Sequence, residues 1–392
     1  MPSSFDWKPV LLAGLIVSIG QFSMGLVFPA LPWIAQDFSI SAEDAQLLIS
    51  IYLLGFGPSQ LIYGPMSDAL GRKPILIAGL LLAILGLSIA ILASFSFDML
   101  VLGRFIQGLG AGCCAVLARA SIRDSYDGAN LPRALSWVTI VASFTPIIAP
   151  VLGGFINHAF GWLAVFIALL SYIGLVITLL FFVFTETLAV KKPLPNLTAM
   201  LSTYKMLITS RYFLSFASIG WFNFSLVVIS ISVMPFIMQI QIGMNSDQYA
   251  LWALIPACGL LVGGTICNRV RPKIGTKKML FCAPFVHLTG AIWLIFAPLT
   301  PLSMMFGQFL LTLGNGIAFP CAQTQLLVPY KEKAGSVAAL SGGGQMTFAS
   351  LLGMVLMSFG IQQAWHLGVV VVFITIFSSI GIWFGFKSEP KQ

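Results

Sequence analysis

The residues that could do chemistry are few in this sequence, because only 8% of its 392 residues are charged and 58% are hydrophobic. They form no catalytic set: the sequence has no Ser-His-Asp arrangement, no His/Cys/Asp cluster with metal-ligand spacing and no glycine loop for nucleotides. We therefore expect neither an enzyme nor a metal or cofactor site. A soluble domain carries roughly 25% charged residues, so the composition also argues against a soluble enzyme and a nucleic-acid-binding module.

One charged run has a defined spacing. The residues from Gly64 to Lys73 read Gly-Pro-Met-Ser-Asp-Ala-Leu-Gly-Arg-Lys. Asp68 and Arg72 stand four positions apart, which allows an ion pair at a helix end, and Asp68 could instead cap the helix that follows. The other interpretation is an ordinary turn whose basic residues mark the cytoplasmic side of a membrane.

Two further ionisable residues lie inside apolar stretches. Arg104 interrupts the run Met99–Ala118, and an arginine within a membrane span costs at least ~2.5 kcal/mol. It therefore needs a partner inside a helix bundle, unless its side chain snorkels to the outer interface. His287 is the only titratable group near the middle of an apolar stretch, and imidazole suits proton exchange near neutral pH. A hydrogen-bonded packing role is the alternative for His287.

Proline and glycine concentrate in the stretch Thr145–Gly154. It begins with Thr145-Pro146 and ends with Ala149-Pro150-Val151-Leu152-Gly153-Gly154. Two prolines and two glycines within ten residues favour a kinked helix that packs closely against a neighbour. A generic kink is the alternative interpretation.

Membrane-spanning helices must position these residues. A spanning helix needs about 20 mainly apolar residues. The charge-free runs give twelve such spans once three long runs are divided near Asn157–Gly161, Pro298–Pro301 and Gln362–Gln363. With twelve spans both termini lie on one side, and that side then holds every one of the 20 lysines and arginines except Arg104. The positive-inside rule places this side in the cytoplasm.

The chain also repeats itself in parallel register. Ser18–Phe22 in the first span recurs as Ser218–Phe222 in the seventh, and Gly103–Gly112 in the fourth recurs as Gly307–Gly316 in the tenth. We therefore predict an all-α integral membrane protein of twelve transmembrane helices in two pseudo-symmetric six-helix bundles. The expected bounds are residues 1–184 and 212–392 for the bundles and residues 185–211 for a cytoplasmic linker.

These motifs resemble those of a known family, the major facilitator superfamily. The run Gly64–Lys73 and the Arg104-x-x-Gln107-Gly108-x-Gly110 pattern are similar to its signatures, and Ala149–Gly154 is similar to the antiporter motif of its drug-exporting members, with Ala149 in place of the leading glycine. Residues around Gln21, Tyr52 and Arg119 narrow the resemblance to the EmrD-type multidrug exporters within the Bcr/CflA-like drug–proton antiporters. The resemblance spans nearly the whole chain, and it implies the major facilitator fold and alternating access between the two bundles.

The resemblance also implies roles in gating and proton coupling. It makes Asp68 part of a latch that holds the halves in the outward-open state, and it makes the proline–glycine helix a seal between them. Drug antiporters of this kind often carry an acid in the first span, and this sequence has none there, so Asp68 and His287 both stay open as proton carriers. The candidate gating and coupling residues are Asp68, Arg72, Arg104, Arg119, Pro150, Gly153, Gly154 and His287.

The candidate pocket residues combine aromatic rings with a few hydrogen-bonding groups, which suits a site for varied apolar ligands. The resemblance places Gln21 and Tyr52 in a central cavity, and the internal repeat puts Trp221 at the position equivalent to Gln21. The candidate substrate-binding residues are Gln21, Phe28, Tyr52, Phe144, Trp221, Asn223, Phe224, Gln345 and Phe348. For each aromatic residue, packing against the core or lipid is the alternative.

The sequence therefore predicts a proton-coupled multidrug efflux antiporter that exports hydrophobic or amphipathic compounds from the cytoplasm or the inner leaflet. Its expected partners are small hydrophobic drugs, protons and the lipid bilayer of a bacterial inner membrane, without nucleic acid, and we expect a monomer. The alternative is a solute-specific symporter or importer on the same fold. That alternative would need more hydrogen-bonding groups in the cavity, and it does not explain Ala149–Gly154.

Overall fold

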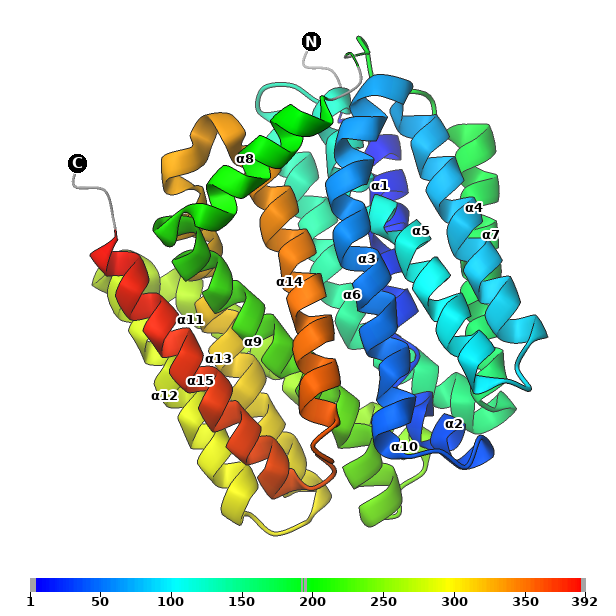
Figure 1. Cartoon of the computed structure of the whole chain (residues 1–392), viewed down its shortest axis with the longest axis vertical. Coiled ribbons are helices and arrows are strands. Elements are labelled where there is room, and N and C mark those ends of the chain that lie inside the picture. The colour runs from blue at the N-terminus through cyan, green and yellow to red at the C-terminus, as the bar shows by residue number, and fades with distance from the viewer. Residues whose placement is uncertain (1–4, 192, 194–195, 389–392) are drawn as a thin grey trace. The chain divides into compact units, whose positions relative to one another are not determined.

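The computed structural model describes residues 5–191, 193 and 196–388, and all regular structure within these ranges is helical (Figure 1). The elements are α1 (Lys8–Gly25), η1 (Phe28–Ala30), α2 (Leu31–Asp37), α3 (Ala42–Leu70), α4 (Arg72–Leu92), α5 (Phe97–Ser125), α6 (Asn130–Phe160), α7 (Trp162–Val183), α8 (Leu197–Thr209), α9 (Arg211–Phe236), η2 (Ile237–Gln241), α10 (Ser246–Trp252), α11 (Leu254–Ile274), α12 (Thr276–Phe296), α13 (Pro301–Leu327), η3 (Val328–Lys333), α14 (Ala334–Met357) and α15 (Ala364–Lys387).

Twelve stretches of helix in the described ranges are long and apolar enough to cross a membrane. This confirms the predicted number of spans. The three long apolar runs divide where the sequence indicated: α6 gives way to α7 at Gly161, α12 to α13 before Pro301, and α14 to α15 before Ala364. Gly161 has a φ of 81°, a left-handed conformation that glycine adopts without steric cost, so the chain can reverse there within one residue.

The packing divides the chain into two compact units. Unit 1 comprises Met1–Ala30 and Ile51–Leu197, and unit 2 comprises Leu31–Ser50 and Thr198–Gln392. The segment Leu31–Ser50 thus belongs by sequence to the first half of the chain and by packing to unit 2. The bundle bounds predicted from the internal repeat describe the sequence duplication, and they stay a prediction.

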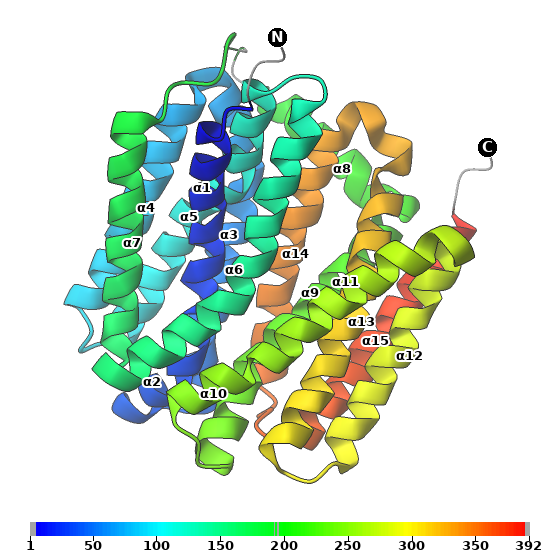
Figure 2. The same ribbon diagram turned by 180° about the vertical axis from the view of Figure 1, so that it is seen from behind.

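Close backbone contact shapes the interior of unit 1. The helices α4 and α5 run side by side, as both views show (Figure 1, Figure 2). A Cβ atom on Gly103 would lie 2.6 Å from the carbonyl oxygen of Gly86 and 2.8 Å from the amide nitrogen of Ala90. Glycine therefore allows these two backbones to touch, as small residues do between membrane helices.

Unit 2 contains a continuous apolar core. Side chains of α9, α12, α13, α14 and α15 meet in a cluster that includes the buried residues Leu226, Met234, Leu294, Met305 and Leu367. The predicted linker contains the helix α8, whose Leu207 is buried and whose Leu201 is 61% exposed. This helix lies between the last span of the first half and the first span of the second half.

Candidate functional site

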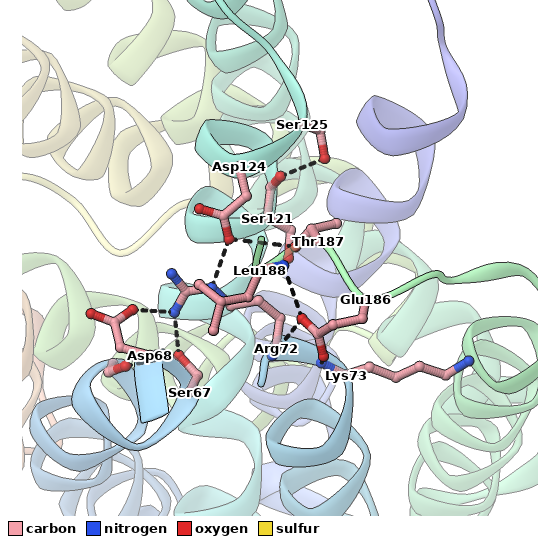
Figure 3. Close-up of polar contacts among 11 residues, drawn as sticks. Ser67, Asp68, Arg72, Lys73, Ser121, Asp124, Ser125, Glu186, Thr187 and Leu188 are labelled. Atoms are coloured by element: carbon pink, nitrogen blue, oxygen red, sulfur yellow. Dashed lines mark hydrogen bonds and ion pairs between the residues drawn. The ribbon is translucent and has the colours of Figure 1, made fainter. Parts of the chain in front are cut away.

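The turn between α3 and α4 gathers charged side chains around Arg72 (Figure 3). The Nη1 atom of Arg72 lies 2.5 Å from Oδ1 of Asp68, and its Nε donates to Oδ2 of Asp124 at 2.8 Å. Nη1 also donates to the hydroxyl of Ser67 at 2.6 Å. The Arg72 side chain is only 8% exposed, so water screens these pairs less than it screens a surface ion pair. Of the two roles that the sequence left open for Asp68, the structure shows the ion pair.

The cap of α4 comes from Glu186, in the segment that follows α7 (Figure 3). Its Oε1 accepts a hydrogen bond from the amide of Arg72 at 2.9 Å, and its Oε2 accepts one from the amide of Lys73 at 3.1 Å. The first amides of a helix have no partner within the helix and carry the positive end of its dipole, so a carboxylate is stabilised there. The residue before the helix, Gly71, has a φ of 114° and no side chain that could serve instead.

The electrostatics of Glu186 agree with this capping role. Its partial burial raises its pKa, but hydrogen bonds from the amides of Leu188, Arg72 and Lys73 outweigh that effect, and the pKa of the carboxyl lies below its ordinary 4.5. Glu186 is therefore ionised at neutral pH. The hydroxyl of Thr187, the next residue, donates to Asp124 at 3.4 Å, so the segment after α7 contacts both α4 and the end of α5.

Asp124 and Glu186 were not among the predicted site residues. Both stand at the end of a span, beside basic or polar neighbours. This position is the only feature of the sequence that could have indicated them. Together with Asp68 and Arg72 they join the ends of α3, α4 and α5 to the segment after α7. All four residues belong to unit 1, and the latch between the halves that the resemblance implies stays a prediction.

Arg104 lies inside unit 1 and its side chain is fully buried. Its Nη1 donates to the carbonyl oxygen of Ser23 at 2.8 Å and to Oε1 of Gln107 at 2.7 Å. The guanidinium carbon lies 4.4 Å from the centre of the Tyr52 ring, a cation–π arrangement. Complete burial excludes the snorkelling alternative.

Tyr52 is therefore held between Arg104 and α1. Its side chain is only 1% exposed, and its hydroxyl donates to the carbonyl oxygen of Gly20 at 3.1 Å. The arrangement joins α1, α3 and α5 around one buried cation. Ser23 and Gln107 accept the hydrogen bonds of the Arg104 guanidinium. Neither was predicted as a site residue, although Gln107 stands in the motif that suggested Arg104.

The proline–glycine motif of α6 packs against the end of α1. A Cβ atom on Gly25 would lie 2.5 Å from the Cβ of Ala149, and a Cβ on Gly153 would collide with the backbone of Leu26. Both Pro150 and Gly154 are buried. The motif therefore brings two backbones of unit 1 into direct contact, as the abundance of small residues predicted.

In unit 2, α9 and α14 bring several predicted pocket residues together around Trp221. The indole Nε1 donates to the carbonyl oxygen of Ser341 at 3.0 Å, and the ring packs over Gly344, with the Phe348 ring 5.9 Å away between centroids. Gln345 is buried close by, near Gly220. The indole is half-buried, so this cluster offers an aromatic surface with a few hydrogen-bonding groups beside it.

Gln323 is a further polar side chain at this cluster that the sequence did not single out. Its Nε2 donates to the hydroxyl of Ser341 at 3.4 Å. The backbone carbonyl of Ser341 accepts from Trp221, so one residue of α14 contacts both side chains. Gln323 lies on α13. The sequence of a helix does not indicate which of its polar side chains contacts a neighbouring helix.

The remaining predicted residues are spread over both units. Asn223 is buried and donates to Ser378 of α15 at 3.2 Å and to its own helix, which is a packing role. His287 is 2% exposed in α12, and its ring occupies the space above Gly314 of α13. The others are placed as follows: Phe28 buried in η1, Gln21 half-buried in α1, Phe224 half-buried in α9, Phe144 exposed on α6 and Arg119 exposed on α5.

The segment Leu31–Ser50 is bonded to the rest of unit 2 through side chains at three places. The indole Nε1 of Trp33 donates to Oε1 of Gln239 at 3.0 Å and to the hydroxyl of Ser246 at 2.7 Å. Gln362 donates to Glu43 at 2.7 Å, and Ser350 donates to the carbonyl oxygen of Ser50 at 2.6 Å. These contacts tie α2 and the start of α3 to η2, α10, α14 and the loop before α15.

Comparison with known proteins identifies the same family that the sequence motifs resemble. A family model described as the Major Facilitator Superfamily matches residues 12–354. The multidrug resistance protein MdtL of Escherichia fergusonii is 30% identical to this chain over 349 residues, which cover 85% of the chain and 86% of that protein. MdtL of Escherichia coli strain K12 / DH10B matches with the same identity and coverage.

Two solved structures resemble the whole chain. A D-xylose–proton symporter has a TM-score of 0.70 at 15% identity, over 96% of this chain and 97% of that one. The human organic anion transporter MFSD10 has a TM-score of 0.69 at 14% identity, over 96% and 98%. Identities this low carry information on the fold alone, and they confirm the predicted twelve-helix fold class.

Proposed function

The chain belongs to the major facilitator superfamily, and from this premise we propose that it is a multidrug exporter driven by the proton gradient. The observation that carries the proposal is the 30% identity to multidrug resistance proteins over 85% of the chain. We propose further that it works by antiport in a bacterial inner membrane, as a monomer, and that it falls within the EmrD-type branch of the Bcr/CflA-like exporters.

The Trp221 cluster supports lipophilic and aromatic substrates. Trp221 and Phe348 present ring faces, while Gln345 and Gln323 add hydrogen-bonding groups. None of these four side chains is ionised, so the cluster binds by stacking and hydrogen bonding. A tolerant site of this composition accepts ligands of varied shape.

The charged clusters of unit 1 support a coupling role. Asp68 combines partial exposure of its side chain, 30%, with an ion pair to a nearly buried arginine. Protonation of Asp68 would remove one of the two ion pairs of Arg72 and leave Asp124 as its partner. One charge moved through ~100 mV supplies about 2.3 kcal/mol, roughly a 50-fold concentration ratio, which is a useful gradient for an exporter.

The importer alternative has less support. The resemblance to a sugar symporter is at 15% identity and concerns the fold alone. A sugar site needs many hydrogen-bonding partners, and the cluster around Trp221 contains two amide side chains beside its rings. The multidrug relatives are 30% identical over 85% of this chain, whereas the sugar symporter is 15% identical over 96% of it.

The deciding experiment follows a lipophilic fluorescent dye in everted membrane vesicles that contain the protein. After the membrane is energised by respiration, the dye should be pumped against its gradient, and an uncoupler should return it. Vesicles with an empty vector serve as the control. Pumping that requires ATP and persists with the uncoupler would contradict proton drive, and a failure to move any of a panel of lipophilic dyes would contradict drug export.

A further inference from the structure

A groove runs along the surface of unit 2 between α9 and α15. It lies next to the Trp221 cluster, because the ring of its wall residue Phe222 lies 4.9 Å from that of Phe348 between centroids. The two helices lie side by side (Figure 1), and the groove between them has a volume of about 1000 Å³. Its walls include Phe222 of α9 and Phe377, Ile380 and Phe384 of α15. The last three side chains are 45–53% exposed, so the groove opens to the surroundings of the unit along its length.

The groove is charged at one end only. Arg211 at the start of α9 and Lys387 at the end of α15 both line it, and no acidic residue is among the described residues that do. Lys387 Nζ lies 4.8 Å from the ring centre of Trp383, and Lys277 Nζ lies 5.4 Å from that of Phe386, so a third cation stands near the same end. Positive charge therefore meets the apolar walls at one mouth of the groove.

The dimensions fit one leaflet of a bilayer. Phe222 follows Arg211 by eleven positions, which is about 16 Å along a helix. The hydrocarbon core of a bilayer is ~30 Å thick, so one leaflet measures ~15 Å. The charged mouth is also on the side where the lysines and arginines of the chain gather, which the positive-inside rule assigns to the cytoplasm. Anionic lipid headgroups attract basic residues at that surface.

We propose that this groove binds an anionic phospholipid of the inner leaflet. Its phosphate lies between Arg211 and Lys387, and one acyl chain runs along the groove past Ser218 to Phe222 and Phe377. The charge selects the headgroup and the aromatic wall holds the chain. The lipid site adjoins the proposed drug site through Phe222 and Phe348, and lipid binding there does not depend on the transport activity.

The test uses the full-length protein, purified and delipidated in a mild detergent. It is mixed with equal amounts of phosphatidylglycerol and phosphatidylcholine that carry the same acyl chains, and the bound lipid is identified by native mass spectrometry. We expect one phosphatidylglycerol to be retained in preference to phosphatidylcholine. Equal retention of the two lipids by the unchanged protein would overturn the proposal, whatever the variants do.

Two matched variants locate the site. Arg211→Gln with Lys387→Gln should weaken phosphatidylglycerol binding by roughly 30-fold, because each basic residue near an anionic surface contributes about fivefold. Lys273→Gln with Lys278→Gln removes the same charge from the same unit outside the groove, and it should leave the affinity unchanged. Equal weakening by both pairs would show that only net charge matters and would overturn the assignment.

A third variant tests the chain-binding wall. Ser218→Phe fills the groove without changing any charge, and it should reduce retention of both lipids.

The transported dye tests whether the groove binds the transport substrate instead of a lipid. Displacement of phosphatidylglycerol by the dye at transport concentrations would assign the groove to substrate and contradict a lipid site, while retention of the lipid supports it.

Discussion

Trp221 contributes both a ring face and a fixed orientation. Its N–H is bonded to the backbone of Ser341 and its ring packs over Gly344. Trp221→Ala should weaken binding of planar aromatic drugs by about 1–3 kcal/mol if the ring is a pocket anchor. Trp221→Phe, the matched control, keeps a ring and loses the N–H, so it should retain part of that affinity. Binding of a fluorescent drug to the purified protein measures both.

The repeat-equivalent residue Gln21 leads to a different expectation. An amide donates and accepts hydrogen bonds, so Gln21→Ala should change the order of preference among substrates more than it lowers total transport. Dye-efflux rates for a panel of drugs with different polar groups measure the order. An unchanged order, with all rates lowered equally, would remove Gln21 from the binding site.

Glu186 gives a prediction for pH. Its pKa is lowered in the folded protein, so its stabilising contribution is complete above the ordinary value of 4.5 and fades as the pH falls through the lowered pKa. At pH 7, Glu186→Gln should cost about 0.3–1 kcal/mol, the typical contribution of a charge at a helix end. Thermal unfolding in detergent at several pH values should show the difference from wild type disappearing under acid conditions. Asp127→Asn, an exposed loop change, is the control and should show no such difference.

The residue scale also shows what a sequence can and cannot reveal. The pair Asp68–Arg72 was predictable because its partners stand only four positions apart in the sequence, on either side of one tight turn. Asp124 and Glu186 reach Arg72 only through the packing of three helices, and a single sequence contains no measure of that proximity. Tyr52, which the resemblance assigned to a cavity, is packed beneath Arg104 because a buried cation requires a compensating surface; its role in substrate binding stays a prediction.

At the scale of elements, the α1–α6 contact depends on the absence of a side chain at Gly153. A methyl group there would collide with the Leu26 backbone, and overpacking of a tight contact typically costs about 1–3 kcal/mol. Gly153→Ala should therefore lower the melting temperature and the transport rate. Gly174→Ala in α7, where a Cβ meets nothing within 4 Å, is the matched control and should be neutral or slightly stabilising. Equal effects of the two changes would contradict the packing argument.

The long helices were predictable because a membrane allows few alternatives. Charge-free runs must form spans of about 20 residues, and their polar or glycine breaks mark the turns, as at Gly161. The short elements were not predictable in this way. The helix α2 and the π-helical η2 continue the apolar runs of α1 and α9, so no change in composition separates them from the spans that they extend.

At the scale of the whole molecule, we expect Asp68 to act in turnover rather than in drug binding. It pairs with Arg72 at the turn between α3 and α4 of unit 1, whereas the Trp221 cluster belongs to unit 2. Asp68→Asn should therefore abolish proton-driven efflux while the drug affinity in detergent stays near that of wild type. Asp98→Asn, an exposed change at the first turn of α5, should leave both intact. A parallel loss of affinity in the Asp68 variant would remove it from the latch.

The assignment of Leu31–Ser50 to unit 2 has a topological consequence. The backbone passes from one unit to the other near residues 30, 50 and 197, three times rather than once, so the units are interlaced by their own chain. Cutting the segment between α7 and α8 therefore leaves two polypeptides that still share a folded body, because α2 and the start of α3 remain hydrogen-bonded to the second one. Co-expressed as separate fragments, the two pieces should copurify through an affinity tag on either one. Trp33→Ala with Glu43→Gln should weaken that association. Fragments that separate without any substitution would show that the contacts of α2 and the start of α3 do not hold the two pieces together.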